Sequence, residues 1–272
     1  MKVVDASNLA DTKLSILLQG HAGGGKTSGI FSLPEPIVAC YADPHDDRVA
    51  GLMKGGRQIT LYIPEDWGDF EQKFVPMVVN REFDAESIVV DSWPFLAMML
   101  MRTPGIGNAE GVVTPTDTGK RIQIWGAVSG HQQNMLLQLA SARVPIPGKR
   151  NYNLGVTTHL TEVFKGEGEK RQLIGYRPDI PGGFKDEFTR CFGAALICQA
   201  VTETTIEGTP PQTKRNTRYR VWSVPPTDLY EAKDSIAGPS TPYKALPPVM
   251  DVAPDGLYNT LRRAWGMETP NK

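Results

Sequence analysis

The sequence predicts an α/β fold in which helices flank a mostly parallel β-sheet and a C-terminal antiparallel β extension follows. Short apolar runs of strand length alternate with segments that place apolar residues at helical spacing. Such an alternation requires crossover connections, and these cover both faces of a parallel sheet. After residue 200 the sequence changes to Thr-rich, strand-like pieces separated by a turn, which is typical of a hairpin.

The expected elements can be placed in chain order. The strand candidates are residues 13–19, 36–42, 58–63, 87–92, 152–158 and 194–200, and the hairpin would pair 201–206 with 217–224. The helix candidates are residues 27–33, which Pro34 ends, 66–80, which Pro76 must kink or end, 122–142 and 255–265. The stretches 102–119 and 161–183 show no periodicity, so we expect loops there that are functional or disordered.

Length and composition bound the organisation and the location of the protein. The 272 residues are expected to form a core, residues 1–235, which includes the hairpin at about 201–224, and a Pro-rich tail, residues 236–272, with a short C-terminal helix. The formal net charge is −1, so any nucleic-acid site must be a local patch. Three cysteines without a C-x-x-C pair, no signal-peptide layout and no apolar run of about 18 residues predict a cytoplasmic protein without a membrane span.

Residues 20–27 form a complete G-x-x-x-x-G-K-T phosphate-binding loop between a predicted strand and a predicted helix. Its glycines permit backbone angles at which consecutive N–H groups converge on a phosphate, and the following helix presents its N-terminus there. Lys26 would reach the β and γ phosphates, and Thr27 would bind Mg²⁺. The expected ligand-binding residues are Gly20, Ala22, Gly23, Gly24, Gly25, Lys26, Thr27 and Ser28. The alternative is a glycine-rich turn that binds nothing.

An acidic side chain is needed beside such a loop as a further magnesium ligand, because Mg²⁺ held by a threonine alone is under-coordinated. Asp91 ends the apolar strand candidate at 87–92 and matches the Walker B pattern, in which the carboxylate contacts Mg²⁺ directly or through water. Asp91 could instead, or in addition, cap the helix that begins near Trp93.

Two further polar positions follow strand candidates. The acidic cluster Asp43, Asp46 and Asp47 comes after the second strand, and Asp43, nearest the strand end, is the candidate for orienting or deprotonating water. A solvated turn is the alternative for the cluster. His159 ends the strand at 152–158 and could sense the γ phosphate, or it could be a satisfied polar group without a role. The expected catalytic set is therefore Lys26, Asp43, Asp91 and His159.

The order of these motifs resembles that of the RecA-like P-loop ATPases. More narrowly, it resembles the phage-encoded ATPases of the Sak-type single-strand annealing group, over about residues 13–235. The segments that carry the resemblance are 20–27, Tyr41-Ala42-Asp43, Ile88-Val89-Val90-Asp91-Ser92, Trp125-Gly126, Thr157-Thr158-His159 and 177–183. Members of the RecA-like class usually place a Glu just after the second strand, whereas this chain offers aspartates, a proline and His45 there.

The resemblance implies ATP and Mg²⁺ as ligands, binding of ATP between the subunits of a homo-oligomer, and single-stranded DNA as a partner. The two loops at 102–119 and 161–183 would face the DNA. The second carries the cations Lys165, Lys170, Arg171, Arg177 and Lys185 around Phe164 and Tyr176, which suits a phosphate backbone with stacked bases. A solvated charged hairpin is the alternative. Basic residues donated to the γ phosphate across the interface would be Lys233, Arg218 or Arg220.

The sequence thus predicts an ATP-binding and ATP-hydrolysing protein that binds single-stranded DNA in phage recombination or annealing, in the host cytoplasm, with a single-strand-binding protein as a further partner. A first alternative is an accessory ATPase that acts on a protein partner in phage replication or packaging. A second alternative is a nucleotide kinase, although the sequence has no Arg-rich segment resembling a lid.

Overall fold

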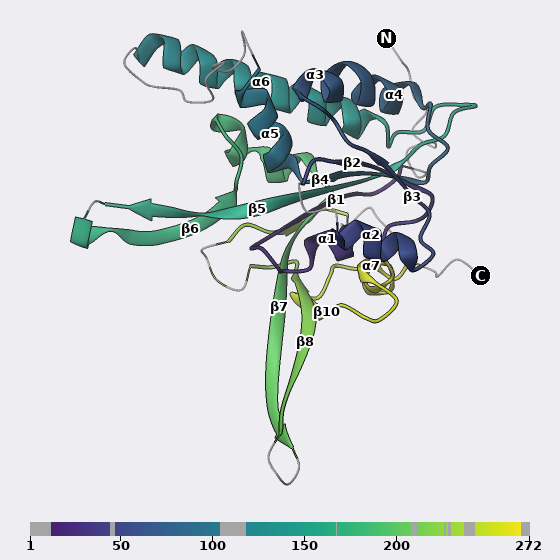
Figure 1. Cartoon of the computed structure of the whole chain (residues 1–272), viewed down its shortest axis with the longest axis vertical. Coiled ribbons are helices and arrows are strands. Elements are labelled where there is room, and N and C mark those ends of the chain that lie inside the picture. The colour runs from purple at the N-terminus through teal and green to yellow at the C-terminus, as the bar shows by residue number, and fades with distance from the viewer. Residues whose placement is uncertain are drawn as a thin grey trace.

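One β-sheet runs through the protein, with helices on both of its faces and two long hairpins that project away from it (Figure 1). The computed structural model describes residues 12–43, 47–103, 118–166, 168–207, 212–225, 227, 230–236 and 243–267. The mixed α/β class with a large, mostly parallel sheet agrees with the prediction from the sequence. Within these ranges, none of the helices combines the length and the hydropathy that a membrane-spanning segment needs.

The parallel part of the sheet has the spatial order β7-β1-β5-β4-β2-β3. These strands are β1 (Ser15–Gly20), β2 (Ile37–Tyr41), β3 (Ile59–Tyr62), β4 (Ser87–Asp91), β5 (Asn153–Lys165) and β7 (Ala194–Glu207). β1, β2 and β4 are buried along their whole length, as central strands covered on both faces must be. The strand candidates from the sequence are all found, and the last one continues without a break into the hairpin strand.

Helices cover the two faces unequally (Figure 1). One face carries α1 (Lys26–Ile30), α2 (Asp47–Lys54) and α7 (Leu257–Trp265), and the other carries α3 (Trp67–Asp69), the π-helical turn η2 (Phe70–Phe74), α4 (Val75–Asn80), α5 (Trp93–Met101) and α6 (Thr118–Ser141). Each face has its own apolar core, one built around Phe31 and Trp265 and the other around Trp67 and Trp93. The long helix expected over 122–142 is confirmed, with an earlier start.

Pro76 does not end the helix expected over 66–80, because it lies inside α4. The helical run is continuous from α3 to α4, but its middle turn, η2, is π-helical and ends two residues before the proline. Because proline lacks an N–H and its ring crowds the preceding turn, the regular ladder of hydrogen bonds cannot pass through it unchanged.

The prediction of an irregular loop over 161–183 is wrong for most of its length. β5 continues to Lys165 and pairs antiparallel with β6 (Gln172–Pro178), with the short 3₁₀ turn η3 (Gly168–Lys170) between them. We call this hairpin, residues 160–178, the β5–β6 arm. It extends beyond the sheet, and of the residues of β6 only Pro178 is buried, so the sequence lacks the alternation of apolar and polar residues that marks a half-buried strand. Two further 3₁₀ turns, η4 (Gly183–Asp186) and η5 (Phe188–Cys191), follow it.

The second hairpin pairs β7 with β8 (Gln212–Trp222) and confirms the predicted antiparallel extension. Its expected turn at 208–211 lies outside the described residues, as do residues 104–117 of the other expected loop and residues 44–46 of the acidic cluster. Residues 118 and 119, predicted to be loop, begin α6.

The C-terminal segment is packed into the fold. β9 (Lys233–Asp234) pairs with β7, β10 (Val249–Asp251) pairs with β8, and α7 lies against α1. Asp234 joins these parts, because its carboxylate accepts hydrogen bonds from Trp265 Nε1 at 3.2 Å and from the backbone N–H of Leu246 at 3.0 Å. The side chain of Trp265 is fully buried.

We expect Trp265→Ala to lower the free energy of unfolding by about 3–5 kcal/mol, because it leaves a cavity under α7 and removes a donor from Asp234. Urea denaturation measures the change. Arg263→Ala on the same helix is the control: its ion pair with Asp255 is exposed to solvent, so the loss should be much smaller than for Trp265→Ala. Equal losses for the two variants would contradict the packing of α7 described here.

Candidate functional site

The Gly-rich loop between β1 and α1 depends on glycine for two separate reasons. Gly23 and Gly25 have φ angles of +77° and +86°, where other residues are strained. A Cβ atom on Gly24 would lie 2.8 Å from the carbonyl oxygen of Cys198 in β7, so the neighbouring strand leaves no room for a side chain. The loop is therefore shaped both by its own backbone angles and by the close approach of β7.

Lys26 directs its ammonium group back into this loop. Its Nζ donates hydrogen bonds of 2.9 Å to the carbonyl oxygens of Gly20 and His21, and the residue is only 7% exposed. The positive charge therefore lies among the backbone groups of the loop and not in solvent. This position suits the binding of an anion held by the loop.

The four expected catalytic residues line one cavity of about 190 Å³. The lining consists of Ala22, Gly23, Gly24, Gly25, Lys26, Thr27, Asp43, Asp91, Phe95 and His159. The structure thus brings together residues from the ends of β1, β2, β4 and β5, as expected for the carboxyl edge of a parallel sheet. Of the expected ligand-binding residues, Gly20 contributes its carbonyl oxygen to Lys26, whereas Ser28 faces a neighbouring cavity.

Strand register explains why these residues meet. In the β1–β5 ladder Gly20 pairs with His159, which places this part of β5 beside the start of the loop. In the β4–β5 ladder Val90 pairs with Val156, so Asp91 lies level with Thr157. β5 therefore separates the loop strand from the strand that carries Asp91, and Thr157 and His159 of β5 lie level with the ends of these two strands.

Asp91 is a buried carboxylate with one satisfied oxygen. The hydroxyl of Thr157 donates to Oδ1, whereas Oδ2 is buried without a well-formed hydrogen bond. Burial raises the pKa of Asp91; hydrogen bonding from Thr157 and Thr27 opposes this rise, and the charge of Asp43 adds to it. The alternative of Asp91 as a helix cap is wrong, because Ser92 occupies the cap position of α5.

These atoms fit a magnesium ion. Mg²⁺ prefers hard oxygen ligands and normally takes only one or two from the protein, the others coming from phosphates and water. Oδ2 of Asp91 and the hydroxyl of Thr27 are oxygens of this kind at one cavity. A divalent cation bound there would also compensate the buried negative charge of Asp91.

His159 and Asp43 occupy the remaining polar positions of the cavity. The imidazole of His159 meets the ring of Phe95 edge-on at 6.3 Å between centroids, and its backbone carbonyl accepts a hydrogen bond from the N–H of Asp179 at 2.8 Å. His159 thus lies at the base of the β5–β6 arm. Asp43 is half buried and follows the end of β2 by two residues.

Sequence reasoning missed the roles of Thr157 and Phe95, and it gave Tyr176 only as an aromatic residue of the second expected loop. The hydroxyl of Thr157 donates to Asp91 and so orients its carboxylate. Phe95 lines the same cavity and follows Asp91 by four residues, so its spacing from Asp91 could have indicated that it lies at the site. The ring of Tyr176 in the arm meets that of His21 in the loop edge-on at 5.2 Å and stacks on Tyr230 at 4.5 Å. No local pattern predicts such a contact between distant segments.

The expected DNA-contacting cations lie on or beside the arm. Lys165, Lys170 and Arg171 are near its tip, Arg177 is in β6 near its base, and Lys185 lies on η4. The guanidinium of Arg171 stands 3.8 Å above the ring of Phe164, which is 37% exposed. The tip therefore presents an aromatic ring and positive charges together.

The residues expected to act across a subunit interface have partners within this chain. Lys233 Nζ donates to the carbonyl of Arg190 at 3.0 Å, Arg218 pairs with Glu203 at 2.8 Å, and Arg220 pairs with Asp251 at 2.5 Å. Among the described residues around the cavity of the Gly-rich loop, none of the three basic candidates is found.

Comparisons with known proteins add little to this geometry. No family model and no curated protein matches the sequence. Among solved structures, the flagellar accessory protein FlaH from Methanocaldococcus jannaschii aligns with 81% of this chain and 89% of its own, with 10% identical residues and a TM-score of 0.33. A similarity of this extent carries no functional argument, which must rest on the residues themselves.

We expect Asp91→Asn to raise the unfolding temperature of the ligand-free protein at pH 7. Because the pKa of Asp91 is raised in the fold, its ionised form destabilises the protein above the unfolded-state pKa. The advantage of the variant should therefore shrink as the pH falls towards about 4. Thermal unfolding without ligand, between about pH 4 and pH 8, measures this. Asp84→Asn, an exposed carboxylate, is the control. A wild-type chain that is more stable than Asp91→Asn at pH 7 would contradict the assignment.

Proposed function

We propose that this chain is a Mg²⁺-dependent ATPase of the RecA-like P-loop class. The observation that supports it best is the meeting of Lys26, Thr27 and Asp91 at one cavity, with an unsatisfied carboxylate oxygen at a place suited to a cation. The position of β5 between β1 and β4 supports the class, because Thr157 and His159 of β5 then lie beside Asp91 and the loop.

Each residue has a distinct role in the proposed reaction. The loop N–H groups and Lys26 bind the phosphates and stabilise the negative charge that shifts towards the leaving group. Thr27 and Asp91 hold the Mg²⁺ ion, which supplies further compensation of charge. Asp43 orients the attacking water, and His159 contacts the terminal phosphate from the end of β5.

We expect Lys26→Ala and Asp91→Asn each to lower kcat for ATP hydrolysis by about a hundred-fold or more, because each removes a charge that acts on the transferring phosphate. Release of inorganic phosphate with Mg²⁺ measures the rate. Lys54→Ala and Asp84→Asn, which change exposed residues away from the cavity, should hydrolyse ATP like the wild type. Wild-type rates in Lys26→Ala and Asp91→Asn would rule out this site.

We further propose single-stranded DNA as the partner of the β5–β6 arm. Phe164 and Ile174 are 37% and 46% exposed on a two-stranded hairpin that projects away from the sheet (Figure 1). Together with Lys165, Lys170 and Arg171 they offer stacking surfaces beside positive charges, which is the combination that single strands bind. The contact of Tyr176 with His21 would connect this arm to the phosphate loop.

We expect Arg171→Ala to weaken binding to a single-stranded oligonucleotide and to reduce the slope of log affinity against log salt by about one phosphate contact. Fluorescence anisotropy over a salt series, with ATP present, measures both. Lys54→Ala is the control with the same loss of charge on another surface. Binding that is absent, or independent of salt and of Arg171, would favour the rival in which the arm contacts a protein partner.

The remaining expectations stay predictions from the resemblance. They are assembly into a homo-oligomer, donation of Lys233, Arg218 or Arg220 across its interface, contact with a single-strand-binding protein, and a role in phage recombination or annealing.

A further inference from the structure

A second cavity adjoins the phosphate loop on its other side. Its volume is about 340 Å³, within the range of small-ligand sites, and Gly24 and Gly25 line both this cavity and the first one. Ser28 and Gly29 of α1 continue its floor, Tyr219 of β8 forms one wall, and residues 252–257 between β10 and α7 form another. A ligand anchored in the loop can therefore extend into this second cavity.

Tyr219 is held against the loop and still has an open face. A Cβ atom on Gly25 would lie 2.5 Å from Cδ1 of the tyrosine ring, so the ring packs directly on the backbone of the loop. The residue remains 43% exposed and lines the cavity. It therefore offers a fixed aromatic surface next to the place where the phosphates are proposed to bind.

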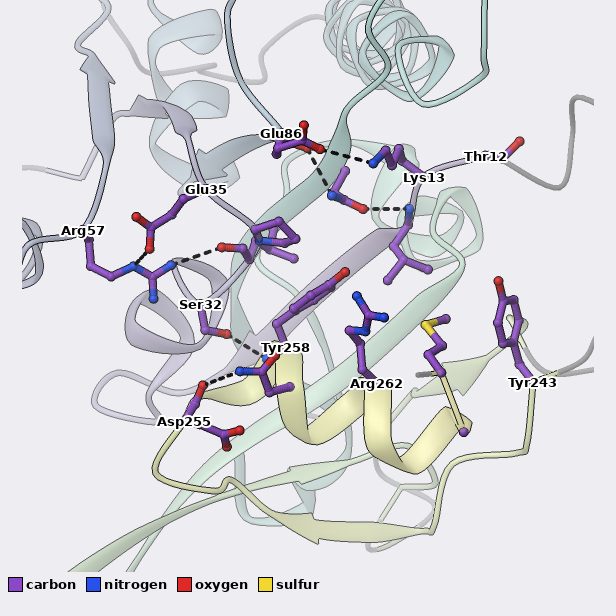
Figure 2. A pocket seen from close by; sticks show the side chains of 17 residues that line it. Thr12, Lys13, Ser32, Glu35, Arg57, Glu86, Tyr243, Asp255, Tyr258 and Arg262 are labelled. Carbon is purple, nitrogen blue, oxygen red and sulfur yellow. Dashed lines mark hydrogen bonds and ion pairs between the residues drawn. The ribbon is translucent and has the colours of Figure 1, made fainter. Parts of the chain in front are cut away.

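The opposite wall is fixed by hydrogen bonds from several elements. The N–H of Val252 donates to the carbonyl of Tyr219 at 2.8 Å, and the N–H of Ala253 donates to the hydroxyl of Thr260 at 3.0 Å. The N–H of Tyr258 donates to Ser32 Oγ at 2.8 Å, a bond drawn in Figure 2, and that hydroxyl donates in turn to Gly29. The two walls and the floor are thus tied together before any ligand binds.

Charged side chains around this cavity are already engaged with one another. Arg220 pairs with Asp251, Arg57 with Glu35, and Asp255 with Arg263. The rest of the lining of the second cavity consists largely of apolar side chains and backbone groups, including Val221, Pro254 and Leu257. Such a surface suits an uncharged planar group and not a further phosphate.

We propose that this second cavity holds the base and ribose of the nucleoside triphosphate, with the base packed on Tyr219 and covered by residues 252–257. The inference rests on the proposed function, because it assigns the other half of the same ligand. It gives the C-terminal segment a direct part in binding, through a wall that lies far from the loop in the sequence.

A third cavity, of about 860 Å³, is larger than the other two but is not assigned to the nucleoside. It lies around Lys13, Glu86 and Tyr258 at the opposite edge of the sheet, where β1 and β4 begin (Figure 2). It shares Ser32, Arg57 and Asp255 with the second cavity but none of the glycines at residues 20–25.

The test compares two ligands that share their phosphates. Calorimetric titrations with Mg²⁺ measure the affinity for inorganic tripolyphosphate and for the non-hydrolysable β,γ-imido analogue of ATP. We expect Tyr219→Ala to weaken binding of the analogue about ten-fold or more and to leave tripolyphosphate binding unchanged, since only the stacked base is lost. Tyr219→Phe, which keeps the ring, and Thr217→Ala, on the same strand outside the cavity, should bind both ligands like the wild type.

Three results would overturn the inference in distinguishable ways. Equal affinity of the wild type for the two ligands, without an effect of Tyr219→Ala, would leave the phosphate site standing and remove the nucleoside site. If Tyr219→Ala lowered the affinity for both ligands equally, the ring of Tyr219 would only shape the loop and would not bind the base. Binding of neither ligand to the wild type would overturn the proposed function as well.

Discussion

The position of β5 between β1 and β4 is the constraint on which the site depends. Hydrogen bonding on both sides fixes its register, so that His159 lies beside the loop and Thr157 beside Asp91. A shift by one residue would turn every side chain of β5 to the other face of the sheet. The same strand continues beyond the sheet and pairs with β6 to form the β5–β6 arm. The position of β5 in the sheet therefore also fixes where the arm begins.

Burial at this site carries a cost that the rest of the fold must offset. Asp91 is ionisable, buried and incompletely hydrogen-bonded, and Lys26 is almost fully enclosed. Burial disfavours the charged form of Asp91 and raises its pKa. Two apolar cores on opposite faces of the sheet, with Trp93 in one and Trp265 in the other, supply the compensating stability. Burying the charged Asp91 at the site therefore lowers the stability of the ligand-free protein, whereas the apolar cores raise it.

Much of the fold and of the phosphate site is predictable from local patterns. Buried strands appear as apolar runs, and the G-x-x-x-x-G-K-T sequence fixes both the loop and the identity of its lysine and threonine. Asp91 is recognisable because it ends such a run. Prediction fails at the β5–β6 arm, where β6 has only Pro178 buried and lacks the alternation of apolar and polar residues that marks a half-buried strand.

By itself, the sequence determined the chemistry of the Gly-rich loop and the order of the strands and helices along the chain. Both depend on backbone angles and on burial within short segments. Tertiary structure alone decided which strands are neighbours, that Thr157 orients Asp91, and that Tyr219 packs on Gly25. Ser32 and Tyr258 meet although 226 residues separate them. Contacts between such distant residues depend on how the helices pack on the sheet. The periodicity of a short segment carries no information about which distant segment it will contact.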